Sequence, residues 1–201
     1  MIYLNPHLIM LPILLPLIAG ALMVLINERH HRLKFLINLF STAVMLLTAI
    51  QLLMQAERGL WPADMAVYLA ANWSAPFGIV LVADRLAAIM LLLTATLGAA
   101  TLVFSYSRWS KTGVHFHTLF QLLLMGINGA ILTADLFNLF VFFEVMLAAS
   151  YGLLLHGYNI SRIRAGMQYI VVNLVASLFF LIGIALVYAA TGTLNFADLA
   201  L

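Results

Sequence analysis

The sequence contains no cysteine, and only 8% of its 201 residues are charged. The absence of cysteine excludes disulfides, thiolate metal sites, iron–sulfur ligation and a cysteine nucleophile. Nine Lys and Arg against seven Asp and Glu are too few and too scattered to bind a phosphate backbone, so nucleic acid is excluded as a partner. Gly-rich phosphate loops and the GxSxG and GxGxxG motifs are also missing, so nothing supports nucleotide binding or hydrolase chemistry.

Hydrophobic residues dominate what is present, at 65% of the chain, with a mean hydropathy of +1.11. A water-soluble domain is about half apolar and about a quarter charged. A helix needs about 20 apolar residues to cross the hydrocarbon core of a bilayer. We therefore predict an all-α polytopic membrane protein with about six transmembrane helices. The nearly uncharged spans are residues 8–26, 35–54, 86–104, 118–134, 136–155 and 165–190.

Basic residues are distributed unevenly over the loops between these spans. Seven follow the first, third and fifth spans, whereas only Arg58 and Arg85 lie on the other side. Because Lys and Arg favour the cytoplasmic side, we predict a cell-membrane protein with its N-terminus outside. The basic residues at span ends are interpreted as anchors that extend their charges towards the headgroups. These four residues are Lys34, Arg108, Arg162 and Arg164.

The only long connection between spans runs over residues 55–84 and contains several turn-forming residues. Two short apolar runs, residues 65–69 and 78–82, flank a cluster of turn residues at 72–76. This pattern predicts a small β-hairpin, with an irregular loop on the membrane as the alternative.

One charged residue, Glu144, falls well inside a span. At about 1.5 Å per residue it lies roughly 14 Å from Asp135, near the middle of the membrane. Because an acidic group there costs about 3 kcal/mol, we expect it to face the bundle interior or a hydrated cavity. Such a carboxyl can take up and release a proton; the alternative is a glutamate that only ties helices together. Asp135, on the opposite side of the helix, is interpreted as its N-cap.

Other polar residues in the spans give weaker signals. They could line a hydrated proton path past Glu144 or form hydrogen bonds between helices. The candidates for the path are Asn128, Tyr151, His156, Asn173 and Ser177, and Gln121 has the same two interpretations. None of the six histidines has the spacing of metal ligands, so we predict neither a metal site nor a cofactor.

The residues that carry a family resemblance are LFQLLLMGINGA at 119–130 and DLFNLFVFFE at 135–144. Further support comes from APFGI at 75–79, DRL at 84–86 and AASYGLLLHG at 148–157. Together they strongly resemble the D-type subunit of the Mrp or Pha multisubunit monovalent cation/proton antiporters. That subunit is related to the antiporter-like, proton-conducting subunits of respiratory complex I.

The resemblance implies a fold of about fourteen helices, of which this chain is the N-terminal part. Residues 1–117 would form an N-terminal three-helix region with the outer loop 55–84. Residues 118–201 would begin the first inverted repeat and end before its broken helix. In the wider family a glutamate at the place of Glu144 is thought to pair with a lysine on that broken seventh helix.

The first functional hypothesis is therefore a transporter subunit rather than an enzyme. It would move protons past Glu144 in exchange for Na⁺ or K⁺, within a hetero-oligomeric complex in the lipid bilayer. The alternative is a proton-translocating membrane subunit of complex I (NADH:quinone oxidoreductase) or of a membrane-bound hydrogenase. A third possibility is that the six-helix region serves only in packing or assembly.

Overall fold

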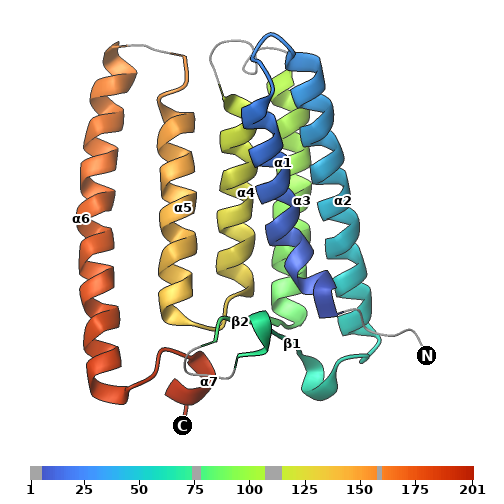
Figure 1. Cartoon of the computed structure of the whole chain (residues 1–201), viewed down its shortest axis with the longest axis vertical. Helices are drawn as coiled ribbons and strands as arrows, with labels where there is room; N and C mark the ends of the chain where they lie inside the picture. Colours follow the sequence, from blue (N-terminus) through green and yellow to red (C-terminus); the bar gives the residue numbers. More distant parts are fainter. Residues whose placement is uncertain (1–5, 74–77, 107–114, 158–159) are drawn as a thin grey trace.

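The computed structural model describes residues 6–73, 78–106, 115–157 and 160–201. The described chain consists of long helices with a small two-stranded sheet at one end (Figure 1). The long helices are α1 (Leu11–Leu25), α2 (His31–Glu57), α3 (Arg85–Tyr106), α4 (Phe116–Leu132), α5 (Leu136–Leu154) and α6 (Ile160–Thr191). The short elements are the 3-10 helices η1 (Pro6–Met10), η2 (Pro62–Asp64) and η3 (Ala70–Asn72), the strands β1 (Ala66–Leu69) and β2 (Val80–Ala83), and the helix α7 (Phe196–Leu199).

The described helices confirm the predicted fold class. Five helical segments are long and apolar enough to cross a membrane, and α4, at 17 residues, is a shorter apolar helix. Each predicted span lies largely within one of these helices. The helices extend a few residues beyond several of the apolar runs, since a helix can continue through polar residues once it leaves the hydrocarbon core.

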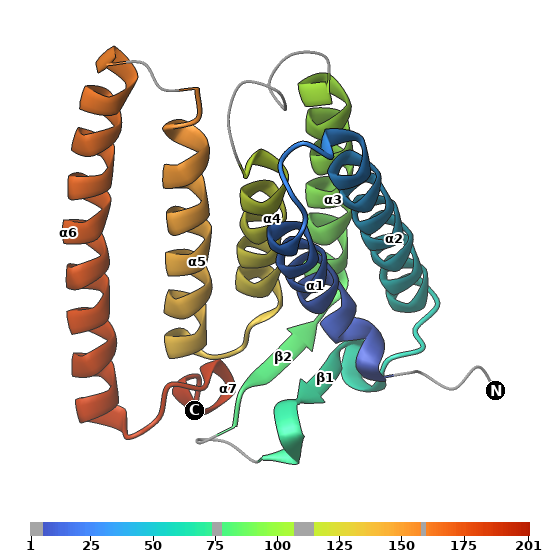
Figure 2. The same ribbon diagram turned by 45° about the horizontal axis from the view of Figure 1, so that its top comes forward.

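The helices α1 to α4 gather on one side of the molecule, and α5 and α6 follow in a row (Figures 1 and 2). Helix α4 is central because it packs against both α1 and α5, while α2 packs against α3. Two glycines permit the close approach of α4 and α5. A Cβ atom at Gly126 would lie 2.8 Å from the Cβ of Met146, and one at Gly129 would overlap the ring of Phe142.

The predicted β-hairpin is present after α2. Strands β1 and β2 pair antiparallel, with Ala66 opposite Ala83 and Leu69 opposite Val80. Part of the predicted turn cluster, residues 74–77, lies outside the described residues. Strand β2 also pairs with the connection between α4 and α5, since the Ala134 N–H donates to the Val80 carbonyl at 3.0 Å.

The connection between α4 and α5 joins the hairpin to the segment before α7. On its other side, the N–H of Leu136 donates to the carbonyl of Leu194 at 2.9 Å. Helix α5 then starts after Asp135, whose carboxylate accepts the Asn138 N–H at 2.8 Å. The interpretation of Asp135 as an N-cap is thus confirmed, because its oxygen satisfies a backbone donor that the first helical turn leaves free.

Candidate functional site

Glu144 is half-buried on the side of α5 that faces away from α4. Phe142 and Met146 are the residues of α5 that press against the glycines of α4. Each is two positions from Glu144, which corresponds to about 200° around a helix. Glu144 therefore lies outside the packed core of α1 to α4, on the surface that α5 turns towards α6.

Two aromatic contacts define how α5 and α6 lie against each other. The rings of Phe140 and Phe180 are 6.0 Å apart between centroids, and those of Tyr151 and Tyr169 are 5.7 Å apart. The two helices run antiparallel (Figure 1), so Glu144, four residues after Phe140, lies near the level of α6 at which residues 176 and 177 stand.

Two further predicted site residues lie on the face of α6 that carries Tyr169. Asn173 and Ser177 follow Tyr169 at steps of four residues, which places all three on one face of the helix. The amide of Asn173 donates to the carbonyl of Tyr169 at 2.8 Å. The structure thus brings Tyr151, Asn173 and Ser177 to the surface between α5 and α6 on which Glu144 lies.

The carboxyl of Glu144 is unpaired among the described residues. Its Oε1 atom is buried with no hydrogen-bond partner there, and the same holds for the hydroxyl of Tyr151. The two groups interact electrostatically along the helix. Leaving a buried polar group without a partner costs about 1–3 kcal/mol, and more for a charged one, so a hydrogen-bonding or positively charged partner would stabilise Glu144 at this place.

The remaining two predicted site residues lie elsewhere. Asn128 is fully buried between α4, α1 and α2, and its amide donates to the Pro12 carbonyl at 2.9 Å and to the Met45 sulfur at 3.0 Å. Asn128 thus forms hydrogen bonds between helices, which was the alternative to a place on the proton path. His156 follows the end of α5, where its ring lies 5.5 Å from that of Phe116.

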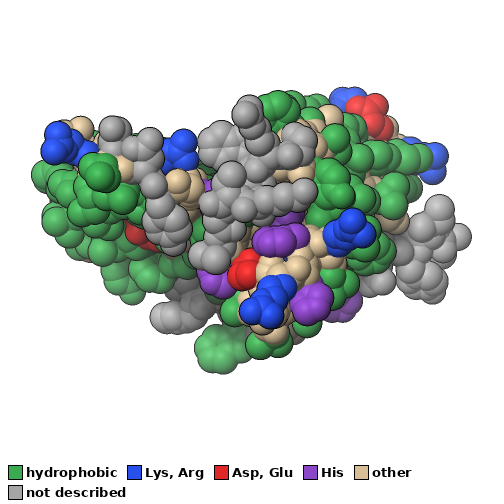
Figure 3. Space-filling view, turned by 90° about the horizontal axis from the view of Figure 1, so that it is seen from above, with side chains coloured by type: hydrophobic (Ala, Val, Ile, Leu, Met, Phe, Trp, Pro, Cys, Tyr) green, Lys and Arg blue, Asp and Glu red, His purple; other side chains and the backbone are tan. Residues whose placement is uncertain are grey.

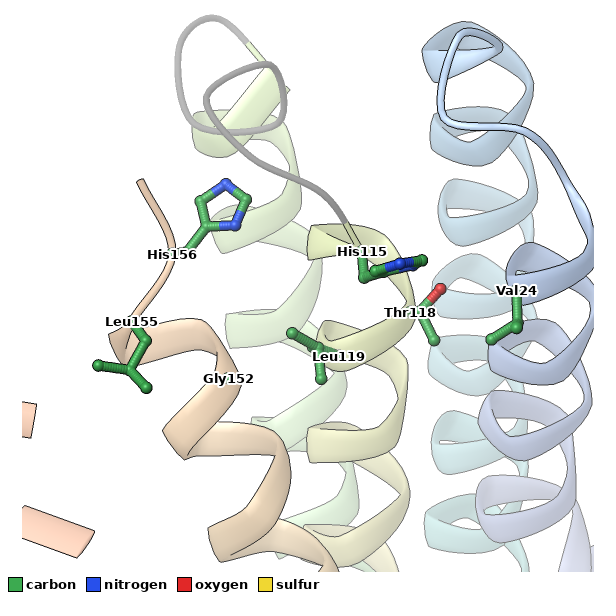
Figure 4. Close-up of a pocket in the computed structure, with 7 residues that line it drawn as sticks. All are labelled: Val24, His115, Thr118, Leu119, Gly152, Leu155 and His156. Atoms are coloured by element: carbon green, nitrogen blue, oxygen red, sulfur yellow. The ribbon is translucent and has the colours of Figure 1, made fainter. Parts of the chain in front are cut away.

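His156 lines a cavity of about 550 Å³ between the ends of α1, α4 and α5. His115, Thr118 and Gly152 line it as well, with His156 beyond the end of α5 and His115 before the start of α4 (Figure 4). The rest of its lining is apolar. The cavity lies near the end of α5 that carries Tyr151, rather than beside Glu144.

Lys34 does not extend towards the headgroups as predicted. Its side chain is only 1% exposed, and its Nζ lies 2.6 Å from the Oε1 of Glu28, which also lies 3.0 Å from the Nδ1 of His115. Glu28, in the turn between α1 and α2, thus pairs with a lysine in the first turn of α2. Opposite charges six residues apart in one tight turn are the sequence signal that could have indicated this pair.

The other predicted anchors differ among themselves. The guanidinium of Arg162 donates to the carbonyl of His156, so this residue fixes the end of α5, whereas Arg164 is exposed. Arg108 lies outside the described residues.

Comparisons with known proteins show what this chain resembles. Residues 133–201 match the family described as "NADH:quinone oxidoreductase/Mrp antiporter, TM". Over 195 residues the chain is 56% identical to a probable K⁺/H⁺ antiporter D-type subunit of Rhizobium meliloti, covering 96% of this chain and 36% of the relative. It is 43% identical to the D-type subunit of an Na⁺/H⁺ antiporter of Alkalihalophilus pseudofirmus, covering 96% of this chain and 39% of the relative.

Solved structures give the same result for the fold. A chain of the Mrp complex from Dietzia sp. DQ12-45-1b superposes with a TM-score of 0.90 at 33% identity, covering 98% of this chain and 37% of that one. A chain of the membrane-bound sulfane sulfur reductase, an archaeal respiratory membrane complex, superposes with a TM-score of 0.83 at 32% identity, covering 96% and 39%.

The chain is thus an integral, multi-pass α-helical membrane protein. Its sequence is similar to the N-terminal part of the D-type subunits of K⁺/H⁺ and Na⁺/H⁺ antiporters, and its fold to part of a chain of the Mrp complex, which confirms the resemblance drawn from the motifs. It spans between a third and two fifths of the length of the relatives described above.

Proposed function

We propose that this chain acts in a subunit of a multisubunit monovalent cation/proton antiporter. Protons pass through the membrane by way of Glu144 and are exchanged for Na⁺ or K⁺, within a complex that includes other subunits. The support from relatives is that two of them carry the names of K⁺/H⁺ and Na⁺/H⁺ antiporter subunits. The division into residues 1–117 and a repeat that begins at 118 is part of the same proposal.

The observation that carries the proposal is the unpaired Oε1 of Glu144, which has no partner among the described residues, on the surface between α5 and α6. Acidic residues inside a membrane are costly, and they are retained mainly where they serve ion or proton pathways. Tyr151, Asn173 and Ser177 add hydroxyl and amide groups along the same surface, which can relay protons through water. Asn128 and His156 are assigned no place beside Glu144.

The test is Glu144→Gln in the intact protein, assembled in its complex in everted membrane vesicles. Glutamine keeps the shape but cannot carry a proton, so we expect transport to fall by about 100-fold. The readout is the collapse of a preformed pH gradient when Na⁺ or K⁺ is added. Co-purification of the complex measures assembly separately.

Glu57→Gln is the matched control. Glu57 is an exposed glutamate at the C-terminal end of α2, where it pairs with Arg85 at the start of α3. Its replacement is therefore expected to leave transport unchanged. A Glu144→Gln complex that assembles and transports at the normal rate would refute the role of Glu144. Loss of the complex itself would favour a purely structural role.

A second candidate function is a proton-translocating subunit of a redox-driven complex. The structural likeness to a respiratory membrane complex favours it. The two functions differ in what drives them. Exchange of a cation gradient for a pH gradient in vesicles without an electron donor supports the antiporter, whereas proton movement only during electron transfer supports the redox complex.

A further inference from the structure

A second group of polar side chains is buried between α2 and α4, away from Glu144. Asn38 and Gln121 are fully buried, and His117 is 3% exposed. This group lies beneath the turn between α1 and α2. Seen from that end, histidine, basic and acidic side chains gather on the surface over the turn (Figure 3). The proposed function uses none of them.

The side chains of this group form a chain of hydrogen bonds in which each member donates to the next, from Ser41 to His117. The Ser41 hydroxyl donates to the Oε1 of Gln121 at 3.2 Å, and the Nε2 of Gln121 donates to the Oδ1 of Asn38 at 2.7 Å. The Nδ2 of Asn38 then lies 3.0 Å from the Nδ1 of His117. An amide nitrogen only donates, so the Nδ1 of His117 accepts and the ring carries its proton on Nε2.

His117 therefore stands at the receiving end of the chain. Its Nε2 atom is buried and has no hydrogen-bond partner among the described residues. Aromatic rings flank the imidazole, with Phe116 at 5.4 Å and Phe35 at 6.1 Å between centroids. No described neighbour thus holds the Nε2 proton in place, while Nδ1 is held by Asn38.

Proton uptake by His117 would reverse the chain. A proton on Nδ1 would face the donor Nδ2 of Asn38, so the Asn38 amide must turn to present its oxygen. Its Nδ2 would then face Gln121, whose amide must turn in the same way and donate to Ser41. The reversed chain keeps the links between Ser41, Gln121, Asn38 and His117. It gives up the bonds that the Nε2 of Gln121 donates to the Asn38 carbonyl at 3.3 Å and to the Thr42 hydroxyl at 3.4 Å.

Charged and titratable groups surround the histidine on several sides. Burial, together with the positive charges of His31 and Lys34 on α2, lowers the pKa of His117 from 6.5 to about 4, and the negative charge of Glu28 in the turn opposes this. His115 lies just before α4 and contacts Glu28, and both are in contact with solvent. The cluster of Glu28, His31, Lys34 and His115 thus lies close enough to act on the buried ring through its charges.

We propose that His117 is a proton-binding site, separate from Glu144, whose protonation reverses the hydrogen bonds through Asn38 and Gln121. The site couples the proton concentration at this end of the bundle to the contact between α2 and α4. It rests on the geometry of the chain alone, so it does not depend on the proposed antiport.

The test is solid-state NMR of the protein in lipid nanodiscs, with ¹⁵N in histidine, asparagine and glutamine side chains. At pH 8 we expect His117 in the neutral form with its proton on Nε2. On acidification, the His117 ring and the amides of Asn38 and Gln121 should shift with one common midpoint. A ring that never titrates, or one that titrates while the amides stay fixed, would overturn the proposal.

Three variants sharpen this test. His117→Gln should abolish the amide shifts, whereas His30→Gln, a change at an exposed histidine in the turn, should leave them intact. Asn38→Asp has the same shape but can only accept from His117, so the midpoint should move upwards by about one pH unit or more. An unchanged midpoint in Asn38→Asp contradicts the proposal even if His117→Gln fails to fold. The readout needs no cation gradient, so it stands or falls separately from transport.

Discussion

Asn128 of α4 donates a hydrogen bond of 2.9 Å to the carbonyl oxygen of Pro12 in α1. This oxygen would normally accept from the N–H four residues later, but residue 16 is a proline and has none. The side chain of α4 thus replaces the missing helical donor. A proline inside a membrane helix is tolerated when a neighbouring helix satisfies the freed carbonyl in this way.

The first prediction is that Asn128→Leu destabilises the protein by about 1–3 kcal/mol, the usual cost of an unsatisfied buried group. In a Pro16→Ala background, the restored N–H of residue 16 can bond to the Pro12 carbonyl. The same Asn128→Leu change should then cost less than half as much. The measurement is a double-mutant cycle of unfolding free energies in mixed detergent micelles.

Equal costs of Asn128→Leu in the two backgrounds would contradict this account. They would mean that Asn128 acts through packing or through its contact with the sulfur of Met45 instead.

The second prediction concerns the contact of α4 with α5. A Cβ at Gly129 would overlap the ring of Phe142, so Gly129→Ala forces the helices apart and should cost about 1–3 kcal/mol. Gly183→Ala is the control, because no described atom lies within 4 Å of its added Cβ. The control should be neutral or stabilising by up to about 1 kcal/mol, since alanine favours helix. Unfolding in micelles measures both, and equal effects of the two changes would show that the close contact is unimportant.

Features that depend on a short stretch of chain could be predicted from the sequence. The apolar runs predicted the long helices, since crossing a bilayer requires a minimum length of apolar residues. Short apolar runs around turn formers predicted the hairpin, and Asp135 before an apolar run predicted the start of α5. In each case the residues that determine the structure lie next to one another in the sequence.

Features that depend on which helices pack together could not be predicted in this way. The spacing of Glu28 and Lys34 permits an ion pair, but whether Lys34 is buried depends on the helices packed around it, so its place at a span end favoured the interpretation as an anchor. Asn128 bonds to a residue 116 positions away, so no local pattern shows its partner. For the candidate site, the spacing of seven residues puts Glu144 and Tyr151 on one side of α5. The register of α6, which brings in Asn173 and Ser177, follows from aromatic contacts between the two helices.

The third prediction concerns acid stability. Burial acts to raise the pKa of the Glu28 carboxyl, but the hydrogen bond from Lys34 and the charges of Lys34 and His115 outweigh it, so the pKa is lowered from its usual 4.5. A lowered folded-state pKa means that this stabilisation is fully present above about pH 4.5 and is lost as the pH falls through the lower folded value. Thermal unfolding between pH 7 and pH 3 should therefore show a loss of stability below about pH 4.5.

Glu28→Gln should remove most of that pH dependence. At pH 7 it should also cost about 3 kcal/mol, near the low end of the range for a broken buried pair because Glu28 is itself 29% exposed. Adding Lys34→Met removes the unpaired charge and should recover most of the loss at pH 7. A Glu28→Gln protein that is as stable as the parent at pH 7 would show that the pair contributes little.

The fourth prediction is the orientation in the membrane. The turn between α1 and α2 and the β-hairpin lie at opposite ends of the helices (Figure 1), and the turn lies at the end richer in basic residues. The positive-inside rule then places the hairpin outside.

Because the chain has no cysteine, single cysteines can report each side without background. His30→Cys reports the turn and Met65→Cys the hairpin, and both positions are exposed. A membrane-impermeant maleimide applied to intact cells, with any outer membrane made permeable, should label Met65→Cys fully, and His30→Cys only after the inner membrane is opened. The reverse pattern would place the N-terminus inside. It would then put the buried His117 at the outer end of the bundle, so that its proton-binding site would respond to external rather than cytoplasmic pH.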